Sequence, residues 1–322
     1  MNLRETFKKQ GGFSLIKNCW RMGALLPATI TFMMLGTSKK ALEIVRLVAQ
    51  FKTNRNLYKK YANKIDALLA EYENNEADVS TSKESRKIYF CWFQGLENAP
   101  FLVKKCLKSL QENITDREIV VITEENYHEY VQFPDFIESK IKRGIISRTH
   151  MSDLLRLELL TRYGGTWVDA TVLCTRKPPD YMLDSDFFVF QLLKPGLDGH
   201  SLGFSTWFIT AKPGELVLRL TLAVLYDYWN KHDVMWDYYI FHHVTEVVRA
   251  RYPEAWAKVI PFSNEVPHML LLRLFDEFDE NIWQAIEEQT PFHKLSYKFD
   301  NEKLEIQNTY YQRLIGADRE YK

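Results

Sequence analysis

The sequence has few cysteines, and they form no recognisable metal or redox motif. Cysteine occurs four times in 322 residues, and no two cysteines make a Cys-X-X-Cys pair. Three of the four lie within apolar runs. We therefore expect reduced core residues of a cytosolic protein, rather than a disulfide or a zinc site, at Cys19, Cys91, Cys106 and Cys174.

Long uncharged segments are also scarce. The charge-free segment near the N-terminus, residues 22–36, has fifteen residues and contains Pro27, whereas a membrane-spanning helix needs about 20 apolar residues. An interfacial or re-entrant segment fits this length better. The start of the chain is basic, but no apolar region and small-residue cleavage site follow in order, so we expect no cleavable signal peptide.

The chain as a whole has no net charge, but its charges are unevenly distributed. The chain has 42 basic and 42 acidic residues, yet residues 1–64 contain thirteen Lys or Arg and only two acidic residues. Such a segment predicts an anionic partner. Because Trp20 and Phe32 suit the headgroup boundary and Lys39 and Lys40 flank the apolar segment, we expect peripheral docking on the anionic inner face of the cell membrane.

Two other interpretations of the basic segment stay open. It can form a helical hairpin that packs on the rest of the protein while its charges are solvated. It can also be a nucleic-acid arm, which we disfavour because phosphate binding does not need the uncharged apolar stretch that interrupts the basic residues.

Composition divides the chain into three parts. We expect a basic, partly apolar helical appendage over residues 1–75, a polar linker over 76–86 and the main domain over 87–322. The main domain begins with a continuous apolar run at 87–93, which is typical of a buried parallel strand. Strand and helix patterns then alternate, so the sequence predicts an α/β fold. The expected helices cover 100–111, 124–131 and the segment that begins at Pro213, and the expected strands cover 118–123, 186–191 and 205–211.

The most informative stretch is residues 151–175. Ser152 is a good N-cap residue, leucines recur at helical spacing after it, and Gly164 and Gly165 predict a helix end that needs positive φ. A strand should follow over residues 167–173.

Asp169 lies late in this predicted strand. An unpaired buried carboxylate there would cost several kcal/mol, so Asp169 needs a partner. In an α/β sheet, ligands bind outside the carboxyl ends of the strands. We therefore expect Asp169 to belong to a functional site.

Asp153 and Arg156 lie three residues apart in the preceding helix. On the expectation that the helix begins at Ser152, both project from its first turn, next to the positive end of the helix dipole. This arrangement suits an anionic ligand. The alternative is an acidic residue favoured by the dipole, with a local ion pair.

Two motifs here resemble the nucleotide-sugar signature of the capsular polysaccharide synthesis proteins, which belong with the DXD-motif sugar-binding glycosyltransferases. They are Ser-Asp-Leu-Leu-Arg at 152–156 and Arg-Tyr-Gly-Gly-Thr-Trp-Val-Asp-Ala-Thr at 162–171. The resemblance implies a GT-A (Rossmann-like) nucleotide-sugar-binding domain and a donor such as a UDP-sugar, bound with Mn²⁺ or Mg²⁺. The sequence departs from Asp-X-Asp at Thr171, where a hydroxyl replaces the second carboxylate and binds metal more weakly.

The resemblance also assigns roles to individual residues. The implied metal ligands are Asp169, Thr171 and His293, and the implied catalytic residues are Asp169, Asp237 and His242. The implied donor-binding residues are Trp92, Gly95, Asp153, Arg156, Gly165, Lys294 and Lys298. Several of them can instead have a purely structural role. Trp92 can be a core residue, and Asp237 and His242 can be ordinary helix residues among core aromatics. Residues 291–298 can be an exposed loop.

The implied function is sugar transfer to a glycan acceptor, expected to be lipid-linked, in capsular or surface polysaccharide synthesis and with retention of configuration. The alternative is a non-catalytic, degenerate GT-A protein that binds nucleotide sugar or scaffolds polysaccharide assembly. Thr171 favours this alternative. The joint presence of Trp92, Asp153, Arg156, Asp169 and His293 opposes it, because a scaffold has no physical need for them together.

Overall fold

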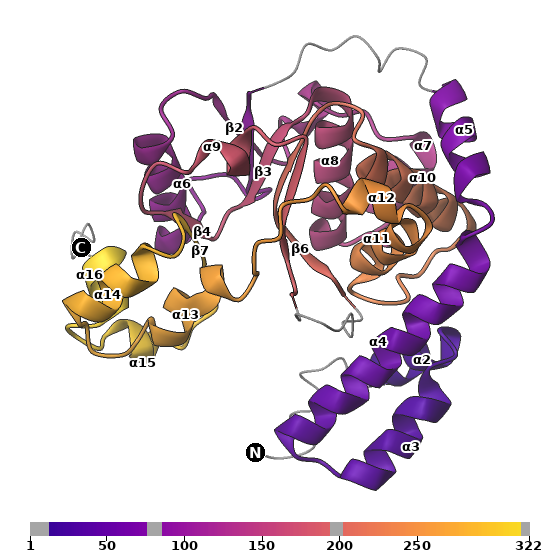
Figure 1. The fold of residues 1–322 in the computed structure, drawn as a ribbon, viewed down its shortest axis with the longest axis horizontal. Helices are drawn as coiled ribbons and strands as arrows, with labels where there is room; N and C mark the ends of the chain where they lie inside the picture. The colour runs from indigo at the N-terminus through magenta and orange to yellow at the C-terminus, as the bar shows by residue number, and fades with distance from the viewer. Residues whose placement is uncertain (1–12, 76–85, 194–201, 317–322) are drawn as a thin grey trace.

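The computed structural model describes residues 13–75, 86–193 and 202–316 (Figure 1). At its centre lies a five-stranded sheet in the order β2-β1-β3-β6-β5. β1 runs parallel to β2 and β3, whereas β6 is antiparallel to β3 and β5. The parallel first strand predicted from the apolar run is therefore confirmed. The strands are β1 (Ile88–Cys91), β2 (Ile119–Ile122), β3 (Gly165–Asp169), β5 (Phe187–Gln191) and β6 (Phe204–Ala211).

Helices cover both faces of this sheet. Alternate residues of β1 point to opposite faces, so Ile88 and Phe90 pack with α6 (Phe101–Asn113) and Tyr89 packs with the helices on the other face. That second layer bears most of the core aromatics, including Trp167 and Trp229. Its helices are α7 (Asp135–Lys142), α8 (Arg148–Tyr163), α10 (Leu216–Lys231) and α11 (Ile240–Arg251).

A smaller C-terminal unit is built on a second sheet. β4 (Val172–Cys174) leaves the central sheet and pairs antiparallel with β7 (Phe292–Lys294). Leu173 and Trp283 belong to the core of this unit. Its helices are α13 (Met269–Arg273), α14 (Glu280–Glu287), α15 (Asn301–Leu304) and α16 (Tyr310–Leu314), which lie together at one side of the molecule (Figure 1).

The N-terminal appendage is helical, as predicted, but part of it packs on the main domain. Leu57 and Tyr61 are buried in the main core, and Lys60 Nζ lies 3.0 Å from His232 Nε2. Ile65 in the following helix is buried in the same core, whereas residues 25–50 extend away from the domain (Figure 1). No helix among the described residues has both the length and the apolar character needed to cross a membrane. The helices are α2 (Phe13–Arg21), α3 (Leu25–Leu35), α4 (Lys39–Tyr61) and α5 (Ile65–Asn75).

Four predicted elements differ in detail. The predicted helix at 124–131 contains only a 3₁₀ turn (Tyr127–Glu129). The N-cap of α10 is Glu215, whereas the sequence predicts that this helix begins at Pro213. The predicted strand at 167–173 is split between β3 and β4, because β4 pairs with β7 instead of continuing in the central sheet. α8 begins before Ser152, as described below. The predicted linker lies, except for Arg86, outside the described residues.

Candidate functional site

The site is centred on Asp169, the last residue of β3. Asp169 pairs in register with Cys91, the last residue of β1, so it lies at the carboxyl ends of two parallel strands. Gly164 and Gly165 allow the chain to pass directly from α8 into β3. Gly164 has φ 66° and ψ −160°, a conformation that side chains rarely adopt, and a Cβ added there would lie 2.6 Å from Pro213 Cδ. The predicted glycine stop is confirmed.

Asp169 accepts two hydrogen bonds and makes a further ion-pair contact. The indole N–H of Trp167 donates to Oδ1 at 2.9 Å, Lys294 Nζ donates to Oδ2 at 2.9 Å, and Arg156 Nη1 lies 3.6 Å from Oδ1. Burial by itself raises the pKa of Asp169, but the charges of Lys294 and Arg156 and the Trp167 hydrogen bond outweigh it and hold the pKa below its usual value. Asp169 is therefore an anion with its partners in place.

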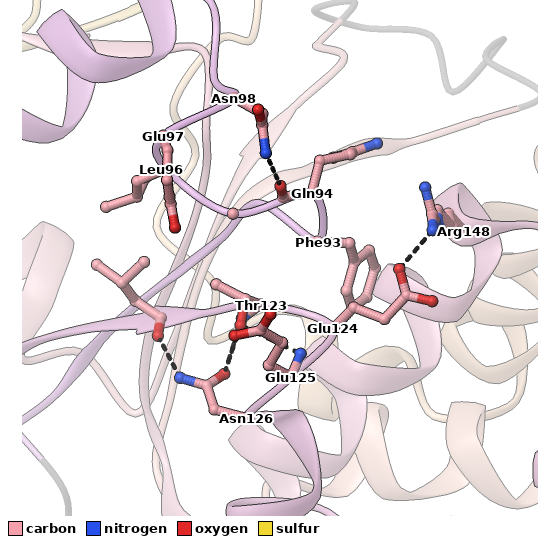
Figure 2. A pocket seen from close by; sticks show the side chains of 12 residues that line it. Phe93, Gln94, Leu96, Glu97, Asn98, Thr123, Glu124, Glu125, Asn126 and Arg148 are labelled. Atoms are coloured by element: carbon pink, nitrogen blue, oxygen red, sulfur yellow. Dashed lines mark hydrogen bonds and ion pairs between the residues drawn. The ribbon is translucent and has the colours of Figure 1, made fainter.

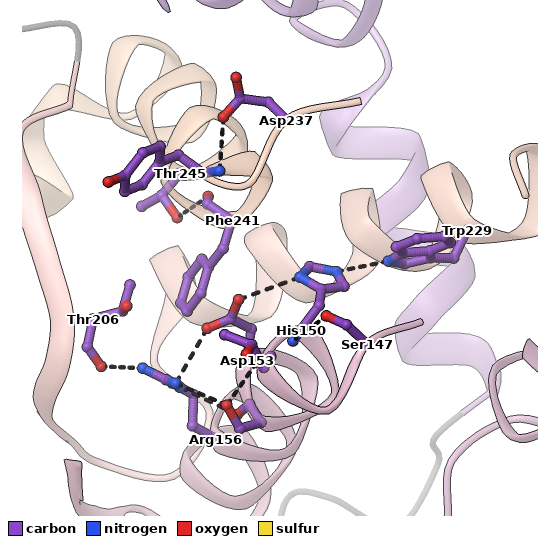
Figure 3. A network of polar contacts seen from close by, with 12 residues as sticks. Ser147, His150, Asp153, Arg156, Thr206, Trp229, Asp237, Phe241 and Thr245 are labelled. Carbon is purple, nitrogen blue, oxygen red and sulfur yellow. Dashed lines mark hydrogen bonds and ion pairs between the residues drawn. The ribbon is translucent and has the colours of Figure 1, made fainter. Parts of the chain in front are cut away.

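Arg156 joins α8 to the sheet (Figure 3). Its guanidinium is buried, contacts Asp153 Oδ1 at 3.2 Å, donates to the main-chain carbonyl of Thr206 on β6, and lies 4.8 Å from the centre of the Trp167 ring. The planar fork of arginine suits this combination of ion pair, carbonyl contact and aromatic face. Arg156 thus positions Asp153 and Asp169 together.

The N-terminus of α8 differs from the prediction. Ser147, not Ser152, is the N-cap, and its side chain accepts from the main-chain N–H of His150. Asp153 and Arg156 therefore lie beyond the first turn, so the free N–H groups at the start of the helix do not face the same ligand as these two side chains. Their proximity to Asp169 comes from packing of α8 against the sheet.

His150 is a member of the network that sequence reasoning missed. Trp229 Nε1 donates to His150 Nε2 at 2.8 Å, and His150 Nδ1 lies 3.2 Å from Asp153 Oδ2 (Figure 3). Because Nε2 accepts the indole hydrogen, Nδ1 carries the proton that is donated to Asp153. The spacing of His150, Asp153 and Arg156 at i, i+3 and i+6 was the available signal.

The implied metal ligands are not brought together. Lys294 Nζ donates to Thr171 Oγ1 at 2.7 Å as well as to Asp169, so its ammonium group bridges the first and third residues of Asp-Ala-Thr. His293 points to the other face of the β4–β7 sheet, where its ring packs 5.5 Å from Trp283 and burial lowers its pKa to about 3. Within the described residues, no group of three or more His, Cys, Asp or Glu side chains could hold a metal ion.

A pocket of about 760 Å³ lies at the carboxyl ends of β1 and β2 (Figure 2). Gly95, with φ 80°, shapes the loop of residues 93–98 that forms one wall. Asn126 braces the opposite wall, because its side chain accepts from the N–H of Thr123 and donates to the carbonyl of Val121. The pocket therefore lies at the same edge of the sheet as Asp169, which pairs in register with the last residue of β1.

Trp92 directly follows the last residue of β1. Its ring is half-buried and meets Tyr297 edge-on at 5.3 Å. Lys298 is exposed, with its ammonium group 5.7 Å from the centre of the same Tyr297 ring. Gly165 begins β3 while Asp169 ends it, so this predicted donor-binding residue lies about 13 Å from Asp169 along the strand.

Asp237 and His242 are not presented by the same helix. Asp237 precedes α11, accepts from the main-chain N–H of Tyr239 at 2.7 Å and faces His243 Nε2 at 3.4 Å, away from the Asp153–Arg156 pair (Figure 3). His242 lies closer to the site. Burial lowers its pKa to about 4, although the charge of Asp153 acts in the opposite direction.

Tyr238 lies next to Asp237 in the sequence. Its side chain is 61% exposed, and partial burial followed by the charges of Asp153 and Asp169 raises its pKa. Its hydroxyl therefore lies within electrostatic range of both carboxylates, at the rim of the site.

The fold and the site define an α/β protein whose strand order reverses at β1. β2 lies on one side of β1 and β3 on the other, and Asp169 ends β3 at this reversal, the place where open α/β sheets bind ligands. The chain belongs to the capsular polysaccharide synthesis protein family, whose profile matches residues 40–314. The match includes most of α4, so the family sequence extends into the appendage.

Other comparisons add little. A solved structure titled "PaToxG Glycosyltransferase" matches with a TM-score of 0.33 and 12% identity, covering 85% of this chain and 98% of that chain. A likeness of this size carries no argument here. No curated protein matches the sequence.

Proposed function

We propose that the protein is a GT-A-type glycosyltransferase that moves a sugar from a nucleotide diphosphate sugar, with UDP-sugars as the first candidates, to a glycan acceptor in capsular or surface polysaccharide synthesis. The observation that carries this proposal is the cluster at the end of β3, where Asp169 is held between Lys294 and Arg156. Cations beside an ordered carboxylate suit a donor that has both a diphosphate and sugar hydroxyls.

The two parts of the donor would occupy different regions. The pocket beside Gly95 has polar walls that include Glu97, Thr123 and the ion pair of Glu124 with Arg148, and such groups suit ribose hydroxyls and the polar atoms of a base. The diphosphate would lie toward Lys294 and Arg156, where the positive charge is. Trp92, which is half-buried and directly follows β1, would stack on the base.

The proposed reaction is substitution at the anomeric carbon of the donor sugar. The bond from this carbon to the β-phosphate oxygen breaks and its electron pair stays on that oxygen, while the acceptor hydroxyl oxygen bonds to the carbon. The hydroxyl proton passes to the departing phosphate. The protein stabilises the charge on the leaving oxygen through Lys294 and Arg156, while Asp169 fixes both cations and accepts from a sugar hydroxyl.

Tyr238 and His242 would line the acceptor side. With its pKa lowered to about 4 by burial, His242 is neutral at pH 7 and can accept a hydrogen bond from an acceptor hydroxyl. Tyr238 offers an exposed aromatic ring for a sugar face.

The proposal is tested by incubating the full chain with UDP- and GDP-sugars and measuring release of the nucleoside diphosphate, with and without glycan acceptors. Release from one donor, lost in Asp169→Asn, supports transfer. Binding of a nucleotide without release from any donor would instead support the non-catalytic alternative.

We further propose that the appendage docks peripherally on an anionic membrane, where a lipid-linked acceptor would lie. α3 contains no charged residue, and Leu26, Met33 and Met34 on it are each more than 70% exposed. Between residues 13 and 55 there are seven Lys or Arg and one acidic residue, which complements anionic lipid.

Docking is tested by sedimentation with vesicles of phosphatidylglycerol and phosphatidylcholine. The double variant Met33→Glu/Met34→Glu should lose most of the sedimentation with anionic vesicles. Leu272→Glu is the matched control, because Leu272 is 73% exposed but lies on α13. Equal sedimentation of all three proteins would contradict docking through α3.

A further inference from the structure

We infer that the ammonium group of Lys294 takes the position of the divalent cation in an Asp-X-Asp site, and that the protein binds its nucleoside diphosphate without a metal ion. This inference rests on the proposed function, because it concerns how the same donor is held.

The first support is the position of Lys294 Nζ. It lies 2.9 Å from Asp169 Oδ2 and 2.7 Å from Thr171 Oγ1, so it contacts one side-chain oxygen of each of the two polar residues in Asp-Ala-Thr. Both distances are those of good hydrogen bonds from an ammonium group. A divalent ion that used both oxygens would have to displace Lys294.

The second support is the poor ligand set that a metal would meet. Thr171 supplies a neutral hydroxyl, and His293 faces the other side of the β4–β7 sheet. Among the residues that the structure describes, Asp169 is the one carboxylate in contact with Lys294, and it also faces Arg156 at 3.6 Å. Hard divalent cations prefer several anionic oxygens, and here one carboxylate is already shared by two fixed positive charges.

The third support is that Lys294 is built into the fold. It lies on β7, paired in register with Val172, and its side chain is only 18% exposed. Its neighbours on the strand, Phe292 and His293, are fully buried, so the backbone that bears Lys294 cannot shift without disturbing two cores. The charge is therefore fixed before the ligand arrives, as electrostatic stabilisation of a leaving group requires.

The resulting site offers two cations to the diphosphate. Lys294 and Arg156 approach Asp169 from different elements, β7 and α8, and each contacts a different carboxylate oxygen. On diphosphate binding, Lys294 keeps Asp169 as its anchor and can give a remaining N–H to a phosphate oxygen, since an ammonium group has three donors. The positive charge that a metal would supply comes from these side chains.

The test is isothermal titration of the full chain with UDP and GDP in EDTA and in Mn²⁺. We expect one nucleotide to bind in EDTA, with an affinity that changes less than threefold in Mn²⁺. Lys294→Gln should weaken binding at least tenfold in EDTA, whereas Lys303→Gln, an exposed lysine on α15, should have no effect. Circular dichroism of both variants checks that they are folded.

A second variant creates the site that the natural sequence lacks. Thr171→Asp/Lys294→Gln has two carboxylates and no ammonium group between them, so it should bind nucleotide better in Mn²⁺ than in EDTA. Mn²⁺ alone, followed by its electron paramagnetic resonance signal, should bind this variant but not the natural protein.

The outcomes separate the two proposals. Nucleotide binding that requires Mn²⁺ in the natural protein, or that is unchanged by Lys294→Gln, would overturn the lysine inference and leave the transferase proposal standing. No binding of either nucleotide and no release from any donor would remove the transferase proposal, and the lysine inference with it.

Discussion

Replacing Asp169 with asparagine separates catalysis from stability at this site. Asparagine keeps the volume of the side chain and can still accept from the Trp167 indole N–H. It loses the charge that faces Lys294 at 2.9 Å and Arg156 at 3.6 Å. We expect the fold to survive and turnover to collapse.

The expected magnitudes follow from the exposure of the site. A hydrogen bond to a charged group contributes about 1.5–3 kcal/mol, and the Asp169 side chain is 27% exposed, so water can solvate the freed Lys294. We therefore expect a loss of about 1–2 kcal/mol in the free energy of unfolding, because Arg156 still has Asp153. Turnover should fall at least about 10²–10³-fold, the effect of removing one preorganised electrostatic contact in an active site.

Asp237→Asn is the matched comparison. The Asp237 side chain is 28% exposed and also has a cationic or hydrogen-bonding partner, His243, but it faces α11 rather than Asp169. The sequence pattern predicts a catalytic role for both aspartates, whereas the geometry predicts a large loss only for Asp169→Asn. Both variants are assayed by nucleoside diphosphate release and by urea unfolding. Equal turnover of Asp169→Asn and the natural protein would refute the assignment of the site.

Two further predictions concern stability. Gly164→Ala should lower the free energy of unfolding by about 2–5 kcal/mol, because the backbone is strained at φ 66° and the new Cβ clashes with Pro213. Gly144 is the control, since it has φ 68° but open space around it, and Gly144→Ala should lower the free energy of unfolding by about 1–2 kcal/mol. A smaller cost for Gly164 than for Gly144 in urea unfolding would contradict the close packing against Pro213. Burial lowers the pKa of His293 in the folded protein to about 3. As the pH falls below about 6.5, His293 therefore binds a proton in the unfolded chain but not in the folded protein. This group should lower the free energy of unfolding by about 1.4 kcal/mol per pH unit. In His293→Gln, the free energy of unfolding should depend less steeply on pH between 6.5 and 4. An unchanged slope would show that His293 has the same pKa in the folded and unfolded states.

The parts of the fold that the sequence predicted well are those fixed by local pattern. The apolar run of β1 is buried on both faces, so it is unmistakable as a parallel strand. The Gly164-Gly165 pair marks the end of α8 because only glycine adopts those backbone angles easily. Elements of this kind need no knowledge of distant partners.

The start of α8 was less predictable. Ser147 and Ser152 are both suitable N-cap residues, and the leucine periodicity begins only after Ser152. The first turn instead contains His150, which is buried because it bonds to Trp229 on α10. A polar residue buried by a distant tryptophan leaves no apolar pattern in the sequence.

The identity of the residue that faces Asp169 was decided by strand register. In Phe292-His293-Lys294, alternate side chains point to opposite faces, so a shift of one residue would exchange His293 and Lys294. Such a shift would bury the Lys294 ammonium group beside Trp283, where an unpaired charge costs several kcal/mol. Neutral His293 occupies that position at far lower cost, since its folded pKa of about 3 keeps it uncharged at pH 7. The penalty for burying a lysine therefore selects the register in which Asp169 meets an ammonium group rather than an imidazole.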